Sequence, residues 1–170
     1  MSTNVLSAFA PIRAFVFDVD GVMTDGTVIA DPSGELLRTL SIRDGYAIKR
    51  ALLTGYRVAI ITGGRSEAVR KRFLNLGPVD YYSNVQDKGP VMQGYIDRHG
   101  LAPAEVLFMG DDLPDLAPMR IAGLACAPAD ACPEVLAEAQ YVSPRTGGNH
   151  CVRDVIERTL KLNGHWAAAA

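Results

Sequence analysis

Residues 14–22 read AFVFDVDGV, and this stretch decides the fold. Its first four residues are all apolar, and Asp18 and Asp20 follow directly. A continuous apolar run is typical of a parallel strand covered on both faces, because a strand with one solvated face alternates apolar and polar residues. The stretch therefore predicts a buried parallel strand over residues 14–18 that ends in carboxylates.

Short apolar runs alternate with longer amphipathic runs along the rest of the chain. Residues 57–61 (RVAII) and 106–109 (VLFM) predict two further buried strands. Shorter strands are expected at residues 79–82, 123–126 and 141–142. Helices are expected at residues 44–53, 66–76, 89–98, 114–122, 133–139 and 151–162. Strands separated by helices are typical of βαβ units, so the pattern predicts an α/β fold: a Rossmann-like three-layer sandwich with a central parallel sheet.

An inserted β-hairpin is expected after the first strand. The turn cluster Asp31-Pro32-Ser33-Gly34 separates two short apolar segments at residues 28–29 and 36–40. A chain of 170 residues has no room for a second full domain. We therefore expect a single domain over residues 1–170, with a core over about residues 12–162 and a flexible tail at 163–170.

Composition limits the class of protein. The chain has 17 Lys plus Arg and 19 Asp plus Glu, which gives no support for binding to nucleic acid or to an anionic membrane, since both need clustered positive charge. No apolar run approaches the length of a membrane span, and residues 1–12 lack the pattern of a secretory signal. Cys126, Cys132 and Cys151 are interpreted as small apolar fillers in a reducing compartment. A cytoplasmic protein is expected.

Polar side chains follow three of the predicted strands. The first strand leads into Asp18 and Asp20, and the second into Thr62, Gly63 and Gly64. The third leads into residues 110–115 (GDDLPD), and Lys88 stands at the start of an intervening helix. The carboxyl ends of parallel strands meet at one edge of the sheet, where ligands bind in this class of fold.

The residue types at this edge suit phosphoryl chemistry. Several carboxylates repel one another unless a cation neutralises them, and Mg²⁺ prefers carboxylate oxygens. A lysine and a hydroxyl beside glycine amides suit a phosphate group, and an aspartate can attack phosphorus as a nucleophile. Each motif alone is also compatible with a turn or a helix cap, which is our interpretation of Asp31, Asp44, Asp97 and Asp154.

The four segments together resemble a known superfamily. Residues 17–21, residues 61–64, Lys88 and residues 110–115 are similar, in this order, to the four motifs of the haloacid dehalogenase superfamily. Residues 20–26, 42–45 and 147–148 further resemble the 3-deoxy-D-manno-octulosonate 8-phosphate phosphatases, and this similarity extends over about residues 14–161.

The resemblance implies a role for each motif residue. Asp18 would be the nucleophile and a Mg²⁺ ligand, and Asp20 the general acid and base, with its backbone carbonyl also on the metal. Asp111 would be the second carboxylate ligand. Phosphate-binding residues would be Thr62, Gly63 and Lys88, and supporting residues would be Asp112 and Asp115.

The resemblance also implies an activity and an assembly. It implies Mg²⁺-dependent hydrolysis of the octulosonate 8-phosphate through an aspartyl phosphate, within lipopolysaccharide biosynthesis. It further implies a homotetramer that forms through the inserted hairpin, no separate cap domain, and a neighbouring subunit that covers the site. Since arginine suits a sugar acid's carboxylate, the candidate substrate-binding residues are Arg43, Arg65 and Arg145. His165 and Trp166 could cover a neighbour's site.

Alternatives remain open at this point. Residues 147–154 (GGNHCVRD) depart from the family pattern at Asn149 and His150, so the substrate could be the nine-carbon analogue 2-keto-3-deoxynononate 9-phosphate or another sugar phosphate. A phosphoacceptor signalling domain also combines an aspartate, an acidic pair, a hydroxyl and a lysine, but in a different order and without a second acid such as Asp20. A binding module that has lost catalysis is disfavoured because no motif position is replaced.

Overall fold

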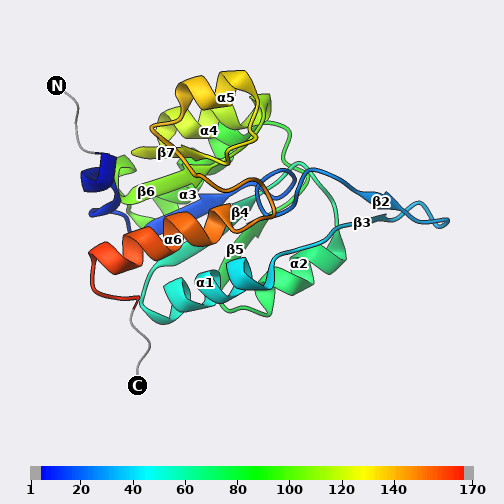
Figure 1. Cartoon of the computed structure of the whole chain (residues 1–170), viewed down its shortest axis with the longest axis horizontal. Helices are drawn as coiled ribbons and strands as arrows, with labels where there is room; N and C mark the ends of the chain where they lie inside the picture. The colour runs from blue at the N-terminus through cyan, green and yellow to red at the C-terminus, as the bar shows by residue number, and fades with distance from the viewer. Residues whose placement is uncertain (1–4, 167–170) are drawn as a thin grey trace.

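A parallel sheet of six strands in the order β5-β4-β1-β6-β7-β8 forms the centre of the molecule, as the computed structural model of residues 5–166 shows (Figure 1). The strands are β1 (Ala14–Phe17), β4 (Arg57–Ile61), β5 (Val79–Tyr82), β6 (Val106–Met109), β7 (Leu124–Ala127) and β8 (Tyr141–Val142). The α-helices are α1 (Ile42–Leu53), α2 (Glu67–Leu74), α3 (Lys88–His99), α4 (Leu116–Ile121), α5 (Pro133–Glu138) and α6 (Cys151–Leu162). The described residues also form three short 3₁₀ helices: η1 (Val5–Phe9), η2 (Pro103–Glu105) and η3 (Leu113–Asp115).

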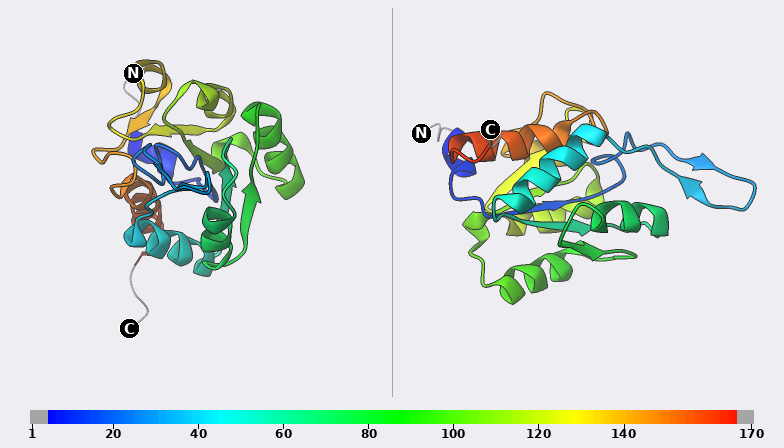
Figure 2. Two further views of the ribbon diagram at one scale, coloured as in Figure 1. Left: turned by 90° about the vertical axis from the view of Figure 1, so that its right-hand side faces the viewer. Right: turned by 90° about the horizontal axis from the view of Figure 1, so that it is seen from below.

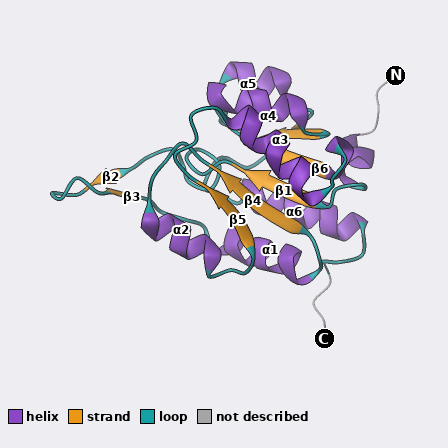
Figure 3. Cartoon of the chain, turned by 180° about the vertical axis from the view of Figure 1, so that it is seen from behind, coloured by secondary structure: helices purple, strands orange, loops and turns teal. Residues whose placement is uncertain are grey.

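Helices cover both faces of the sheet, which confirms the predicted three-layer α/β fold. The face with α1, α2 and α6 packs around Phe15 and Phe17 of β1. The opposite face packs α3, α4 and α5 against Ala14 and Val16 (Figure 3). All four β1 side chains are therefore buried, which explains the continuous apolar run, and burial of each phenylalanine contributes about 1.5–3 kcal/mol.

The sheet topology brings the functional loops together. Strand β1 pairs in parallel with β4 on one side and with β6 on the other, so the carboxyl ends of these three strands are neighbours. From β1 the chain fills one half of the sheet with β4 and β5, and then the other half with β6, β7 and β8. The reversal next to β1 is the position where ligands bind in folds of this kind.

The expected hairpin is present and extends away from the body of the molecule (Figure 2). Its antiparallel strands are β2 (Ile29–Ala30), which lies one residue later than predicted, and β3 (Leu36–Leu37), which is shorter than the predicted segment 36–40. The Asp31 carboxylate accepts hydrogen bonds from the backbone of Ser33 and Glu35, which fixes the turn.

Two predicted helices differ from the structure by more than one residue at their starts. Helix α1 begins at Ile42 rather than at Asp44, because Ser41 is its N-cap and accepts a hydrogen bond from the Asp44 amide. The helix expected over residues 114–122 is divided into η3 and α4, because Asp115 turns its carboxylate back to the preceding loop. Within residues 5–166, no helix is long and apolar enough to cross a membrane.

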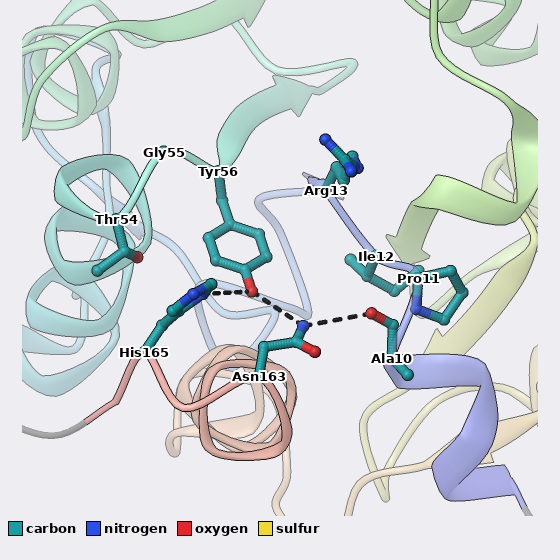
Figure 4. A pocket seen from close by; sticks show the side chains of 9 residues that line it. All are labelled: Ala10, Pro11, Ile12, Arg13, Thr54, Gly55, Tyr56, Asn163 and His165. Atoms are coloured by element: carbon teal, nitrogen blue, oxygen red, sulfur yellow. Dashed lines mark hydrogen bonds between the residues drawn. The ribbon is translucent and has the colours of Figure 1, made fainter.

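The last described residues pack beside residues 10–13 and 54–56, the segments that directly precede β1 and β4 (Figure 4). Asn163 Nδ2 donates hydrogen bonds to Tyr56 Oη (3.0 Å) and to the Ala10 carbonyl (3.3 Å), and His165 Nδ1 lies 3.0 Å from Tyr56 Oη. Trp166 packs against the core cluster. This part of the expected flexible tail is therefore attached to the body, and residues 167–170 lie outside the described residues.

Candidate active site

A cavity of about 480 Å³ opens at the carboxyl ends of β1, β4 and β6. Its lining includes every residue that the sequence predicts for catalysis, phosphate binding, metal binding and metal support: Asp18, Asp20, Thr62, Gly63, Lys88, Asp111, Asp112 and Asp115. These positions span almost one hundred residues of sequence, and the parallel sheet brings them to one site.

Lys88 lies between two carboxylates at the base of the cavity. Its Nζ donates hydrogen bonds of 2.7 Å to Asp18 Oδ1 and to Asp115 Oδ1. Lys88 is the first residue of α3, whose N-cap Asp87 accepts a hydrogen bond from the Gly89 amide. Burial opposes the charge on Lys88, but the two carboxylates outweigh this effect and raise the pKa of Lys88.

Asp115 fixes the loop that carries Asp111. Its Oδ2 accepts hydrogen bonds from the amides of Asp111 (3.0 Å) and Asp112 (3.3 Å). This close approach requires glycine at position 110, since a Cβ there would lie 2.3 Å from the Cβ of Asp115. Asp115 thus contacts Lys88 with one oxygen and orients the Asp111 loop with the other.

Asp18, Asp111 and Asp115 fit a divalent cation. Each offers a carboxylate oxygen, and these oxygens lie within 4.8 Å of one another. Burial, followed by repulsion from Asp115, raises the pKa of Asp18 to about 7 despite the nearby Lys88. Burial and repulsion from Asp18 and Asp115 likewise raise the pKa of Asp111 to about 7. A bound Mg²⁺ would relieve this repulsion, and carboxylate oxygens are ligands that it prefers.

Gly21 allows the first loop to pass directly beside Asp111. Its φ of +86° lies in the left-handed region, and a Cβ there would come within 2.0 Å of Asp111 Oδ2. The paired glycines near the C-terminus serve the same loop, because a Cβ at Gly147 would lie 2.0 Å from the Gly21 carbonyl oxygen. A Cβ at Gly148 would lie 2.7 Å from the Asp25 amide nitrogen. These glycines are thus required by close backbone packing behind the site.

The turn after β4 offers polar groups to the same cavity. Thr62 is buried, and its Oγ1 accepts a hydrogen bond of 3.1 Å from the Gly64 amide. Gly63 and Gly64 leave the backbone beside this hydroxyl uncovered by side chains, which suits the binding of phosphate oxygens.

Asp20 has a partner that the sequence analysis missed. Arg38, which directly follows β3, donates from Nε to Asp20 Oδ1 (2.6 Å) and from Nη2 to Oδ2 (3.0 Å). Nothing in the sequence marks this arginine, because the contact depends on how the hairpin returns to the body.

The three predicted substrate-binding arginines do not line this cavity. Arg43 and Arg145 border a separate groove along α6, and Arg65 Nε donates a 2.7 Å hydrogen bond to Asn84 Oδ1. His150 borders the same groove, with its Nδ1 3.0 Å from Ser41 Oγ. Contact between these arginines and a substrate held at Asp18 remains a prediction.

Comparison with known proteins identifies relatives along nearly the whole chain. No family model matches. The 3-deoxy-D-manno-octulosonate 8-phosphate phosphatase KdsC of Salmonella typhi is 37% identical over 164 residues, which cover 96% of this chain and 87% of the relative.

Solved structures agree with this relationship. The crystal structure of 3-deoxy-D-manno-octulosonate 8-phosphate phosphatase from Yersinia pestis matches with a TM-score of 0.92 and 36% identity, covering 95% of this chain and 88% of that one. The Moraxella catarrhalis phosphatase of the same name, crystallised with a magnesium ion, a phosphate ion and a KDO molecule, matches with a TM-score of 0.92 and 30% identity over 98% of this chain and 95% of its own. With this sequence identity, fold and coverage, the chain belongs to the 3-deoxy-D-manno-octulosonate 8-phosphate phosphatase family of the haloacid dehalogenase superfamily.

Proposed function

We propose that this chain is a Mg²⁺-dependent phosphatase that hydrolyses 3-deoxy-D-manno-octulosonate 8-phosphate to the free sugar acid and phosphate. The observation that carries the proposal is the joining of Asp18, Lys88 and Asp115 by 2.7 Å contacts in a cavity that Asp20, Thr62 and Asp111 also line. The named activity of relatives at 36–37% identity supports the same reaction.

The carboxylates of Asp18 and Asp111 and the backbone carbonyl of Asp20 would hold the Mg²⁺. When bound, the ion supplies positive charge that offsets the charge of the transferring phosphoryl group. The Moraxella catarrhalis relative contains a magnesium ion, which supports this choice of metal.

The reaction would proceed in two steps. In the first, a carboxylate oxygen of Asp18 attacks phosphorus, the bond between phosphorus and the sugar oxygen breaks, and Asp20 donates a proton to the departing oxygen. In the second, Asp20 takes a proton from a water molecule, whose oxygen attacks the phosphorus of the aspartyl phosphate. The bond to Asp18 then breaks and inorganic phosphate leaves.

The remaining residues would bind and orient the phosphoryl group. Lys88, already fixed between Asp18 and Asp115, supplies a positive charge beside the attacking oxygen. The Thr62 hydroxyl and the backbone of Gly63 would bind the phosphoryl oxygens. Asp112 and Asp115 would hold the Asp111 loop in place, since Asp112 caps η3 through the Leu113 amide.

The proposal includes assembly through the hairpin. The side chains of Val28, Ile29, Leu36 and Leu37 are 43–64% exposed, which is unusual for four apolar residues on one small element. Burying this exposed surface between subunits would stabilise a homotetramer, whose neighbouring chains could cover the open cavity. A cytoplasmic location and a role in lipopolysaccharide biosynthesis remain predictions.

A panel of sugar-acid phosphates tests the proposed activity. Phosphate release would be measured from the octulosonate 8-phosphate, from 2-keto-3-deoxynononate 9-phosphate and from neutral sugar phosphates, with Mg²⁺ and with excess chelator. We expect Mg²⁺-dependent release with the highest kcat/KM for the eight-carbon substrate, and loss of release in Asp18→Asn. A higher kcat/KM for the nine-carbon substrate would reassign the substrate. Full activity in the chelator or in Asp18→Asn would overturn the mechanism.

A further inference from the structure

The side chain of Arg38 is almost completely enclosed, although it belongs to the base of an exposed hairpin. It is 8% exposed, whereas its partner Asp20 is 38% exposed at the cavity. Leu36 and Leu37, its neighbours in β3, are both more than 40% exposed. An arginine is costly to bury unless its charge is paired, so the enclosure of Arg38 depends on a specific partner.

All three guanidinium nitrogens of Arg38 have a partner. Nε donates a hydrogen bond to Asp20 Oδ1 (2.6 Å) and Nη2 donates one to Asp20 Oδ2 (3.0 Å), so the guanidinium and the carboxylate meet side-on. Nη1 donates a 2.8 Å hydrogen bond to the Leu36 carbonyl. The first pair fixes the rotation of the Asp20 carboxylate, and the third bond ties the guanidinium to the hairpin backbone.

The Arg38–Asp20 pair also lies against the predicted phosphate-binding turn. A Cβ at Gly64 would be 3.5 Å from Arg38 Nη2 and 3.4 Å from Asp20 Oδ2. It would be equally close, at 3.4 Å, to Thr62 Oγ1. The pair therefore holds the Asp20 carboxylate directly beside the turn that would hold the phosphoryl group.

We infer that Arg38 is a positioning residue for Asp20, which it holds in the orientation needed for proton transfer to and from the reacting oxygens. This inference rests on the proposed phosphatase activity. Asp20 follows β1 in a loop, and a carboxylate there is free to adopt several rotamers unless a partner selects one. Selecting the productive rotamer in advance lowers the entropic barrier to proton transfer.

A double-mutant cycle tests whether Arg38 acts through Asp20. We expect Arg38→Met to lower kcat for the octulosonate 8-phosphate about 10- to 100-fold with KM changed less than about twofold, since general acid–base catalysis contributes about 10²–10⁴-fold. In the Asp20→Asn background, which has lost the group to be positioned, the same substitution should change kcat by less than about twofold. Arg38→Lys retains the positive charge but cannot make the two parallel hydrogen bonds to Asp20. Its kcat should therefore lie between those of the wild-type protein and Arg38→Met.

A control for the loss of an arginine–carboxylate pair, a second substrate and further substitutions of Arg38 separate positioning from other effects. Arg120→Met removes another arginine that pairs with a carboxylate, Glu138 at 3.0 Å; neither residue lines the cavity, so kcat should be unchanged. The second substrate is p-nitrophenyl phosphate, whose leaving group needs little protonation. With this substrate, Arg38→Met should still form the phosphoenzyme quickly and release a burst of nitrophenolate. Hydrolysis of the phosphoenzyme should then be slow, because that step needs Asp20 as a base. If Arg38→Met does not fold, as judged by thermal melting, Arg38→Gln and Arg38→Lys carry the same test.

Three results would overturn the inference. An unchanged kcat in Arg38→Met would show that Asp20 needs no such partner. An equal loss in the wild-type and Asp20→Asn backgrounds, or a rise in KM alone, would mean that Arg38 acts on the substrate rather than through Asp20. If wild-type protein releases no phosphate from any phosphomonoester with Mg²⁺, the proposed function itself fails. This result concerns the wild-type protein and is therefore distinct from the outcomes for the Arg38 variants.

Discussion

Lys88 donates a 2.7 Å hydrogen bond to Asp18 although both side chains are less than one-tenth exposed. A second carboxylate, Asp115, lies at the same distance from the ammonium group. The lysine therefore reduces the repulsion between the Asp18 and Asp115 carboxylates, and it does so before any metal or substrate binds.

Removing the lysine should destabilise the metal-free protein. Lys88→Met leaves Asp18 and Asp115 buried without their cation, which should cost about 3–5 kcal/mol of unfolding free energy at pH 8. The cost should be smaller at pH 5, where protonation of Asp18 relieves the repulsion. Urea denaturation at the two pH values measures both effects, and an equal cost at each pH would contradict this electrostatic role.

Stabilisation by Mg²⁺ should increase with pH. The pKa values of Asp18 and Asp111 are raised from 3.8 to about 7, so their contribution to stability is fully present below pH 3.8. It is lost as pH rises through 7, because the unfolded chain has already released these protons. Mg²⁺ must displace the same protons, so its effect on Tm should be small near pH 5 and largest above pH 7. Melting curves with and without the ion check this, and a pH-independent increase in Tm would disprove it.

Gly21→Ala should weaken metal binding more than it weakens the fold. The added methyl group would meet the Asp111 carboxylate at 2.0 Å and displace it. Gly26→Ala is the matched control: its φ is also positive, at +77°, but the nearest atom to its Cβ would be 3.8 Å away. Both variants carry a backbone cost of about 1–2 kcal/mol, and only Gly21→Ala should lose Mg²⁺ affinity, by about tenfold or more in calorimetric titration. Equal Mg²⁺ affinity in the two variants would show that Asp111 is not a ligand.

Charge on the hairpin should disrupt assembly without unfolding the subunit. Ile29 is 64% exposed and pairs across the hairpin with Leu37, so Ile29→Asp leaves the core unchanged. We expect wild-type protein to run as a tetramer in sedimentation analysis and Ile29→Asp to run as a smaller species. Leu53→Asp on α1, at a position 71% exposed, is the control and should keep the wild-type mass. A monomeric wild-type protein would contradict assembly through the hairpin.

Much of the site could be predicted because the strands are easy to recognise. The apolar runs at 57–61 and 106–109 form strands with the predicted bounds, and parallel pairing with β1 then places their following loops together. The position of Lys88 follows from the same pattern, since it opens a helix beside the sheet.

Contacts that depend on the path of a loop could not be predicted. Arg38 reaches Asp20 only because the hairpin returns beside β1, and no local pattern records that path. Arg43 and Arg145 lie within or just before segments that resemble the family, yet they border the groove along α6. The pattern of apolar residues predicts which strands are buried. It does not predict the direction in which a side chain on a surface loop points.

Trapping the phosphoenzyme tests the central claim most directly. Wild-type protein would be mixed with Mg²⁺ and the octulosonate 8-phosphate, quenched in acid within a turnover, digested and analysed by mass spectrometry. The account predicts a phosphoryl group on the peptide with residues 14–22, assigned to Asp18 and absent in Asp18→Asn. Phosphate release at the normal rate with a phosphoryl group on another residue, or on none, would contradict it.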